Sequence, residues 1–190
     1  MNKYVIVLGF VLWTQISRCQ DIKFGEVSKE ELQETVLSFD KTAHAAILYQ
    51  NQSTYLISNS GGAELITEMH KRIKIYDKDG FDYATEQLRL YKSGTAKETF
   101  GKIKAVTYNL ENDKIIETAL NKDQIFENEL NSNYQEVKFT MPNVKEGSII
   151  EFQYTLRSPF IWNIDDFKFQ YDIPVKSLRA EIRTPVGFIF

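Results

Sequence analysis

Cysteine is almost missing from this 190-residue chain, whose one thiol belongs to Cys19. A single cysteine cannot close a disulfide within the chain, so disulfide-stapled folds are excluded. The fold must therefore depend on a buried core, which a chain of this length can supply. A hydrophobic content of 43%, with 13 Phe and 10 Tyr, provides that core and excludes a disordered composition.

Long apolar runs and an excess of basic charge are also lacking. The one uncharged apolar stretch, Tyr4 to Trp13, is about half of the roughly 20 residues that a membrane-spanning helix requires. The formal net charge is −3, and the Lys and Arg residues are interspersed with Asp and Glu rather than gathered in a patch. We therefore expect neither a transmembrane anchor nor a nucleic-acid partner.

The N-terminus has the three parts of a secretory signal. Lys3 supplies a positive charge, the apolar stretch follows, and the small residues Ser17 and Cys19 lie three and one positions before Gln20. This pattern predicts that residues 1–19 are a signal peptide and that the protein is exported to the periplasm, the cell surface or the medium. Cleavage would leave 21 basic and 26 acidic residues, a net charge of −5. Lipidation of Cys19 is the alternative, but Arg18 stands where a small residue normally precedes a lipidated cysteine.

Residues 20–41 form a polar leader with the signature of a short helix. Ser28 is followed three residues later by Glu31, the pattern of a capping box, and Leu32 and Val36 share one face of the expected helix. We interpret this segment as a lead-in that docks on a larger domain.

From residue 42 onward the hydrophobic pattern has a period of two, which is typical of strands whose side chains point alternately to opposite faces of a sheet. Between these runs lie residues that favour turns. Half-buried antiparallel strands give this alternation. The alternating or β-rich runs are 72–76, 103–110, 136–141, 150–157, 167–173 and 178–183, and the turns are Asp79-Gly80, Asn112-Asp113, Asn143–Gly147, Ser158-Pro159 and Pro185–Gly187.

Strands with one apolar face must stack face to face, because a single sheet would expose its Phe and Tyr row. The sequence therefore predicts a mainly β fold: an antiparallel β-sandwich over residues 42–190 with one or two short peripheral helices. The second helix is expected at Lys122–Leu130. The apolar end Phe188-Ile189-Phe190 is either a final strand or the beginning of a segment that continues in a longer protein, and we favour the latter.

Catalytic motifs are absent from the sequence. The two histidines, His44 and His70, are 26 residues apart, which matches no local zinc spacing, so we interpret both as structural sheet residues. No serine lies in a Gly-x-Ser-x-Gly elbow, and Gly61-Gly62 lacks the Lys and Ser or Thr of a phosphate loop.

Adjacent acids at Glu30-Glu31 and Asp165-Asp166 do not suggest a glycosidase, because neighbours in a strand point to opposite faces. We interpret them as solvated surface or turn residues. The sequence therefore predicts no catalytic, cofactor-binding or metal-binding residue, and no cofactor.

Three aromatic residues lie near predicted turns: Tyr134, Phe160 and Trp162. They could form an exposed platform for a glycan or a peptide, or they could close the ends of the sandwich core. We favour the second interpretation because aromatic side chains are usually buried.

Several segments carry a resemblance to a known family: Phe24-Gly25 and residues 43–48, 70–75, 104–110, 142–151 and 173–175. With them the stretch from Phe24 to Phe190 resembles the domain of unknown function 3857, typical of exported bacterial multidomain proteins. The resemblance implies that a transglutaminase-like domain of the papain type, with a catalytic Cys, His and Asp, follows in the same polypeptide. No residue here can be matched to that triad.

These observations leave one preferred hypothesis and two alternatives. The preferred one is a non-catalytic, exported β-sandwich module that accompanies the downstream transglutaminase-like domain or positions its substrate. The first alternative is a free-standing extracytoplasmic module that binds a glycan or a peptide. The second, a hydrolase in its own right, is disfavoured because no catalytic residues converge in the sequence.

Overall fold

The computed structural model describes residues 22–59 and 62–184. The predicted signal peptide, Gly61, the predicted turn Pro185–Gly187 and the apolar C-terminal end lie outside the described residues. No helix in the described part of the chain is long and apolar enough to cross a membrane.

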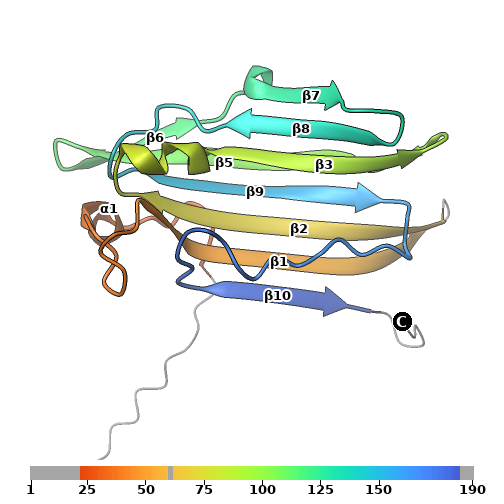
Figure 1. The fold of residues 1–190 in the computed structure, drawn as a ribbon, viewed down its shortest axis with the longest axis horizontal. Coiled ribbons are helices and arrows are strands. Elements are labelled where there is room, and N and C mark those ends of the chain that lie inside the picture. The colour runs from red at the N-terminus through yellow and green to blue at the C-terminus, as the bar shows by residue number, and fades with distance from the viewer. Residues whose placement is uncertain (1–21, 60–61, 185–190) are drawn as a thin grey trace, which may run out of the picture.

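Two sheets make up the fold, as the sequence predicted for a mainly β, sandwich-like domain (Figure 1). The larger has the strand order β10-β1-β2-β9-β5-β6, and the smaller has the order β4-β3-β8-β7. All neighbours are antiparallel except β10, which pairs with β1 in parallel. The strands are β1 Ala45–Asn59, β2 Gly62–Ile75, β3 Thr85–Ser93, β4 Ala96–Lys97, β5 Thr99–Glu111, β6 Lys114–Ala119, β7 Ile125–Glu129, β8 Tyr134–Thr140, β9 Ile149–Ser158 and β10 Leu178–Arg183.

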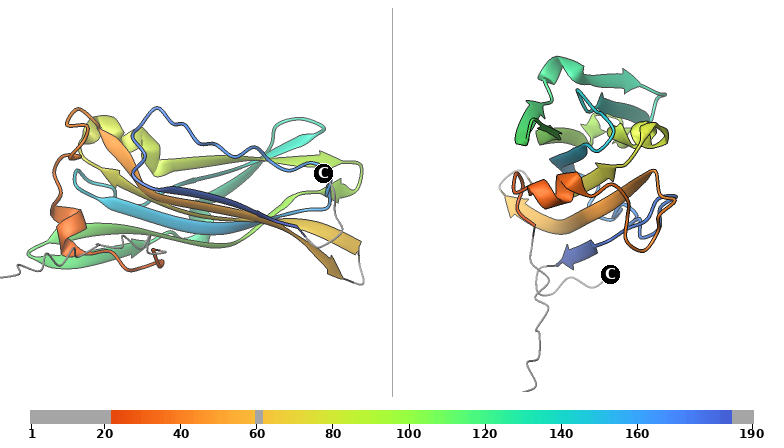
Figure 2. Two further views of the ribbon diagram at one scale, coloured as in Figure 1. Left: turned by 90° about the horizontal axis from the view of Figure 1, so that it is seen from below. Right: turned by 90° about the vertical axis from the view of Figure 1, so that its left-hand side faces the viewer.

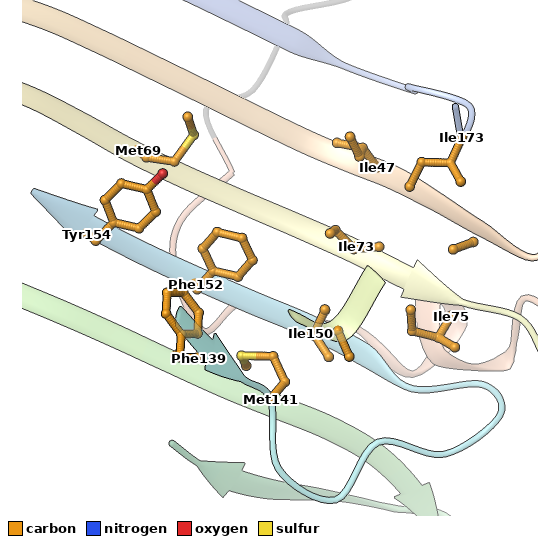
Figure 3. Packing of buried hydrophobic residues seen from close by; sticks show 13 residues of the cluster. Ile47, Met69, Ile73, Ile75, Phe139, Met141, Ile150, Phe152, Tyr154 and Ile173 are labelled. Atoms are coloured by element: carbon orange, nitrogen blue, oxygen red, sulfur yellow. The ribbon is translucent and has the colours of Figure 1, made fainter. Parts of the chain in front are cut away.

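The core lies where the inner faces of the two sheets meet (Figure 3). Phe139 of β8 packs edge-on against Phe152 of β9, with ring centroids 5.5 Å apart, and Ile150 and Met141 lie beside them. Each of these side chains is almost fully buried, which stabilises the fold by roughly 1.5–3 kcal/mol per side chain. The alternation seen in the sequence of β8 and β9 therefore places the apolar residues on the facing surfaces.

The smaller sheet does not cover the whole inner face of the larger one. The remaining part, over β1 and β2, is covered by residues 159–177, which we call the strap (Figures 1 and 2). The Tyr171 hydroxyl donates to Gln50 Oε1 over 2.8 Å, and Ile173 is buried in the core. The prediction of a strand at 167–173 is wrong: its apolar residues do turn inward in part, but none of these residues lies in a strand. The strap backbone pairs with β1 just after this segment, at residues 174–177, where Ile47 and Val175 form an isolated bridge.

The leader covers the opposite, outer face of the larger sheet. Its helix α1, Lys29–Gln33, has the predicted capping box: Ser28 Oγ accepts from Glu31 N, and Glu31 Oε2 accepts from Ser28 N. Leu32 packs into a second apolar cluster with Leu48, Tyr108 and Ile149. The helix ends before Val36, which is exposed, so the expected pairing of Val36 with Leu32 is wrong.

Because the leader lies on this face, the polar positions of β2 and β9 are not wet as their alternation predicted. Arg72, Lys74 and Glu151 are 1%, 0% and 0% exposed. Buried charges of this kind require partners, and the leader supplies several of them.

The other local predictions have mixed outcomes. Asn112 and Asp113 both have positive φ, 50° and 59°, in the tight turn between β5 and β6, as predicted. The helix expected at Lys122–Leu130 is wrong beyond its first turn. A short 3₁₀ helix, η2 (Lys122–Gln124), is followed by strand β7, because Ile125 pairs across the sheet with Phe139.

Candidate functional site

One edge of β3 is largely free of strand neighbours. Along its other edge β3 pairs with β8 from Thr85 to Tyr91, but here it meets only β4, at Lys92 and Ser93. In the described part of the chain no strand lies beside the free edge between Thr85 and Tyr91. The strap lies across from this edge, and two hollows separate the strap from β3.

The first hollow, which we call the aromatic groove, has a volume of about 480 Å³. Its rings form a continuous row: the centroids of Tyr134 and Tyr91 are 5.5 Å apart, those of Tyr91 and Phe160 4.9 Å, and those of Phe160 and Trp162 6.1 Å. Trp162 is 78% exposed at the end of the row. The groove is lined by Arg89, Tyr91, Glu98, Tyr134, Phe160, Trp162, Asn163 and Asp165.

Local sequence explains how these rings meet. Tyr91 and Tyr134 are directly opposite in the β3–β8 register, so their side chains lie on the same face. The predicted turn at Ser158-Pro159 ends β9, where Ser158 Oγ accepts from Phe160 N over 3.2 Å, and turns Phe160 toward Tyr91.

The interpretation that these aromatics close the core fits Phe160 alone, which is 7% exposed. Tyr134 and Trp162 remain on the surface, so part of the row has the exposure of a platform.

The second hollow, the strap cavity, also has a volume of about 480 Å³ and extends between the strap and residues 85–89 of β3. Lys71 lies in it, nearly buried, with its Nζ 5.5 Å from the ring centre of Phe152 and 5.4 Å from that of Tyr171. Glu86 is the carboxylate partner of Lys71, at 3.3 Å. Lys71 is therefore already paired and enclosed, while two further cations, Arg89 and Lys168, also line the cavity.

Asp165 borders both hollows. Both it and Asp166 are exposed residues of the connection between β9 and β10, as predicted. Although Asp165 is exposed, the surrounding protein raises the pKa of its carboxyl group, first through desolvation and then through the charges of Glu98 and Asp166. No described residue forms a hydrogen bond or an ion pair with the Asp165 side chain, and the groove lining has two carboxylates, Glu98 and Asp165, for one cation, Arg89.

Glu98 adds to this charge from the floor of the groove. It is 6% exposed, and its Oε2 accepts a hydrogen bond from the backbone N–H of Tyr91 over 2.7 Å. Among the described residues no cation pairs with it. A buried carboxylate with a single amide donor retains acceptor capacity that a ligand could use.

A second set of charges lies under the leader, around Glu151. Its Oε1 accepts from Arg72 Nη2 over 2.9 Å and contacts His70 Nε2 at 2.8 Å; its Oε2 accepts from Gly25 N over 2.9 Å and from the Tyr108 hydroxyl over 3.3 Å. Burial raises the pKa of Glu151, but His70, the Gly25 amide and Arg72 outweigh it and leave the pKa below its ordinary value.

This cluster, which we call the leader network, fastens the leader rather than opening a site. Arg72 also donates to Glu31 over 3.2 Å, which ties helix α1 to the sheet. His70 lies in β2 between the rings of Phe24 and Tyr49, as expected of a structural histidine. The carboxylate oxygens of Glu151 are both occupied, so the cluster offers a ligand little.

His44 does not lie in a strand, contrary to the prediction, but in a bend before β1. Its Nδ1 is 2.8 Å from Asp77 Oδ2 and 3.9 Å from Asp79 Oδ2, and hydrogen bonding to Asp77 raises the pKa of the imidazole. One nitrogen and two carboxylate oxygens could coordinate a divalent cation. Sequence spacing could not reveal this trio, because Asp77 is 33 residues from His44.

The comparisons with known proteins agree with this fold. The model of the family described as "Domain of Unknown Function with solved-structure structure (DUF3857)" matches residues 64–189. Among curated proteins none matches the chain. Of 13 solved chains that match, one is a crystal structure of a "putative protease" from Parabacteroides distasonis, with a TM-score of 0.58 and 14% identity. The match covers 76% of this chain and 29% of that one, and at this identity it concerns the fold alone.

Proposed function

This chain belongs to the DUF3857 family, and on that premise we propose that it is a non-catalytic module that holds a substrate in the aromatic groove for a transglutaminase-like, papain-type domain of the same polypeptide. The enzyme partner is inferred from the family resemblance. The holding role is inferred from the groove.

The observation that carries the proposal is the row of rings that ends on exposed Trp162 beside unpartnered acids. An exposed tryptophan stacked on a fixed row of rings offers a large, rigid contact area, and such surfaces commonly serve binding. Among the described residues neither histidine is hydrogen-bonded to a hydroxyl or a thiol that could act as a nucleophile: His70 contacts a carboxylate and two rings, and His44 contacts carboxylates. The groove is therefore interpreted as a holding surface.

The position of β10 supports delivery to a following domain. The strand register places the end of β10 and the end of β9 at the same end of the sheet. Arg183 of β10 pairs with Tyr55 of β1. The next residue of β1, Leu56, pairs with Leu65 of β2, which in turn pairs with Ser158 of β9. The strap begins at that same end of the sandwich (Figure 1), and its first residues, Phe160 and Trp162, line the aromatic groove. The last described strand, β10, therefore ends at the same end of the sandwich as the groove.

The experiment is a kinetic one on the whole polypeptide encoded by the reading frame. Trp162→Ala should raise KM for a polypeptide substrate about tenfold and leave kcat unchanged, because a lost stacking contact of this kind is worth about 1.4 kcal/mol. Phe126→Ala, which removes an exposed ring from β7, is the matched control and should change neither constant. A reading frame without a Cys, His and Asp domain, or an unchanged KM, contradicts the proposal.

A free-standing binding module is the second candidate, because the described groove needs no other domain to be complete. A stop codon directly after Phe190 would favour it over the first. Both candidates include export, which rests on the N-terminal signal. Mass spectrometry of the mature protein should find Gln20 as its first residue, and a chain that begins at lipidated Cys19 would contradict simple secretion.

A further inference from the structure

The free edge of β3 presents unused backbone groups to the two hollows. Tyr91 N donates to the Glu98 side chain, and Tyr91 O accepts from Glu98 N over 2.8 Å, so the backbone groups of Tyr91 point away from β8. Backbone groups alternate in direction along a strand, and those of Arg89 and Gln87 therefore point the same way. In the described part of the chain no strand pairs with them there.

Both hollows follow this edge. The strap cavity borders residues 85–89 of β3, and the aromatic groove borders Arg89 and Tyr91. Seven residues of a strand extend over roughly 20 Å. The two hollows share Arg89 and Asp165 in their linings and follow one another along an unpaired strand edge, with the strap on their opposite side.

We propose that an extended peptide segment bearing a lysine or arginine adds to this edge of β3 as a further strand, with its cationic side chain directed to Asp165 and Glu98. This inference rests on the proposed function and names the substrate class of that groove. Strand addition uses main-chain hydrogen bonds for affinity and side-chain pockets for selectivity.

The backbone edge favours a peptide over a glycan, because only a peptide repeats N–H and C=O groups at the spacing of the free Gln87 and Arg89 groups. The Tyr91 groups are already occupied by Glu98, which marks the end of the open edge. The charges favour a cation. Glu98 is buried without a cation, and Asp165 has its pKa raised by desolvation and by Glu98, so a positive group would relieve an existing repulsion. The tyrosine and tryptophan rings attract cations as well.

Binding can be measured through Trp162. Trp13 lies in the predicted signal peptide, so Trp162 is the only tryptophan of residues 20–190, the segment used for this measurement. The probe is the acetylated and amidated peptide Val-Thr-Lys-Val-Thr-Val, with versions carrying Gln or Glu in place of Lys. We expect the Lys peptide to change the fluorescence, the Gln version to bind about fivefold more weakly and the Glu version more weakly still. N-methylation of one set of alternate amides should abolish binding, and N-methylation of the other set should leave it.

Two variants test the edge and the charge separately. Arg89→Pro removes an N–H from the free edge while the ladder to β8 is retained, and should weaken the Lys peptide at least tenfold. Asp165→Asn should reduce the preference for the Lys peptide over the Gln peptide, and the preference that remains is the share of Glu98. Asp123→Asn, in η2 beside β7, is the matched control and should keep the Lys preference. Circular dichroism reports whether Arg89→Pro folds, and the N-methylated peptides test the edge without any substitution.

Equal binding of both N-methylated sets would overturn strand addition, and equal binding of the Lys and Gln peptides would overturn the cationic preference. Binding of a glucosamine oligosaccharide but of no peptide, or no peptide binding at millimolar concentration, would overturn the inference as a whole. These results differ from a failure of the proposed function, which would appear as an unchanged KM in Trp162→Ala or as a reading frame without the enzyme domain.

Discussion

Irregular segments cover part of each face of the six-stranded sheet, but the charged side chains of the two faces differ in whether they are paired. On the outer face the leader closes over Arg72, Lys74 and Glu151, and each of these three charges has hydrogen-bond partners. On the inner face the strap leaves two hollows in which Asp165 and Glu98 lack a cation. A buried cluster of His, Arg and Glu resembles a functional site, but the hydrogen bonds that occupy these groups indicate that the cluster holds the leader on the sheet. Unsatisfied charge beside exposed rings is the better guide to binding.

The leader network gives the largest expected effect. Glu151→Ala should reduce the free energy of unfolding by about 3–5 kcal/mol, because it leaves Arg72 buried beside a cavity with one carboxylate partner fewer. Urea unfolding measures the change. Glu127→Ala, on the exposed face of β7, is the control and should cost less than about 0.5 kcal/mol. A loss below 1 kcal/mol for Glu151→Ala would remove the contrast between the two faces.

Lys74 makes the outer face sensitive to pH. Its Nζ donates to Leu32 O and Gly147 O, both over 2.7 Å, and burial lowers its pKa to about 8. Between pH 8 and the unfolded value of 10.5 the unfolded state binds more protons, so stability rises with pH.

The stability difference between the wild type and Lys74→Met should therefore shift in favour of the wild type by about 3 kcal/mol from pH 7 to pH 10.5. Urea unfolding of both proteins at the two pH values gives this shift. A difference that stays constant would show that Lys74 keeps its ordinary pKa when folded.

On the strap side, two nearby aromatic residues should differ in their roles: Phe160 should contribute to stability and Trp162 to binding. Phe160→Ala should cost about 3 kcal/mol, since Phe160 is buried against Tyr91. Trp162→Ala should cost less than about 0.5 kcal/mol, because the ring is largely exposed. Thermal unfolding compares them. Equal losses of stability in the two variants would mean that Trp162 belongs to the core, which would contradict the exposed platform.

Local sequence patterns correctly predicted two kinds of element. One kind is the turn or helix cap whose partners are close in sequence, and the other is the strand whose alternating residues form one apolar face. The turn Asn112-Asp113, the capping box of Ser28 and Glu31, and the strands β8 and β9 are examples. The segment 167–173 alternates as well as these do, but a strand also requires a partner of compatible direction, and the strap has none along most of its length.

The candidate site depended on contacts that sequence could not place. Phe160, Trp162 and Tyr134 were recognisable as turn-side aromatics, but Tyr91 and Glu98 complete the groove through the β3–β8 and β3–β4 pairings. The buried charges of β2 and β9 were missed for a related reason. Alternation reports which residues share a face, and it does not report that a leader some 40 residues upstream covers that face.

Hydrogen–deuterium exchange with the Lys peptide tests the central claim most directly. If the hollows along the free edge of β3 are the binding surface, the peptide should slow exchange at residues 87–91 and 160–165. The leader network, around Gly25, His70 and Arg72, should exchange as it does in the free protein. Protection at the leader with none at β3 or the strap would contradict the account.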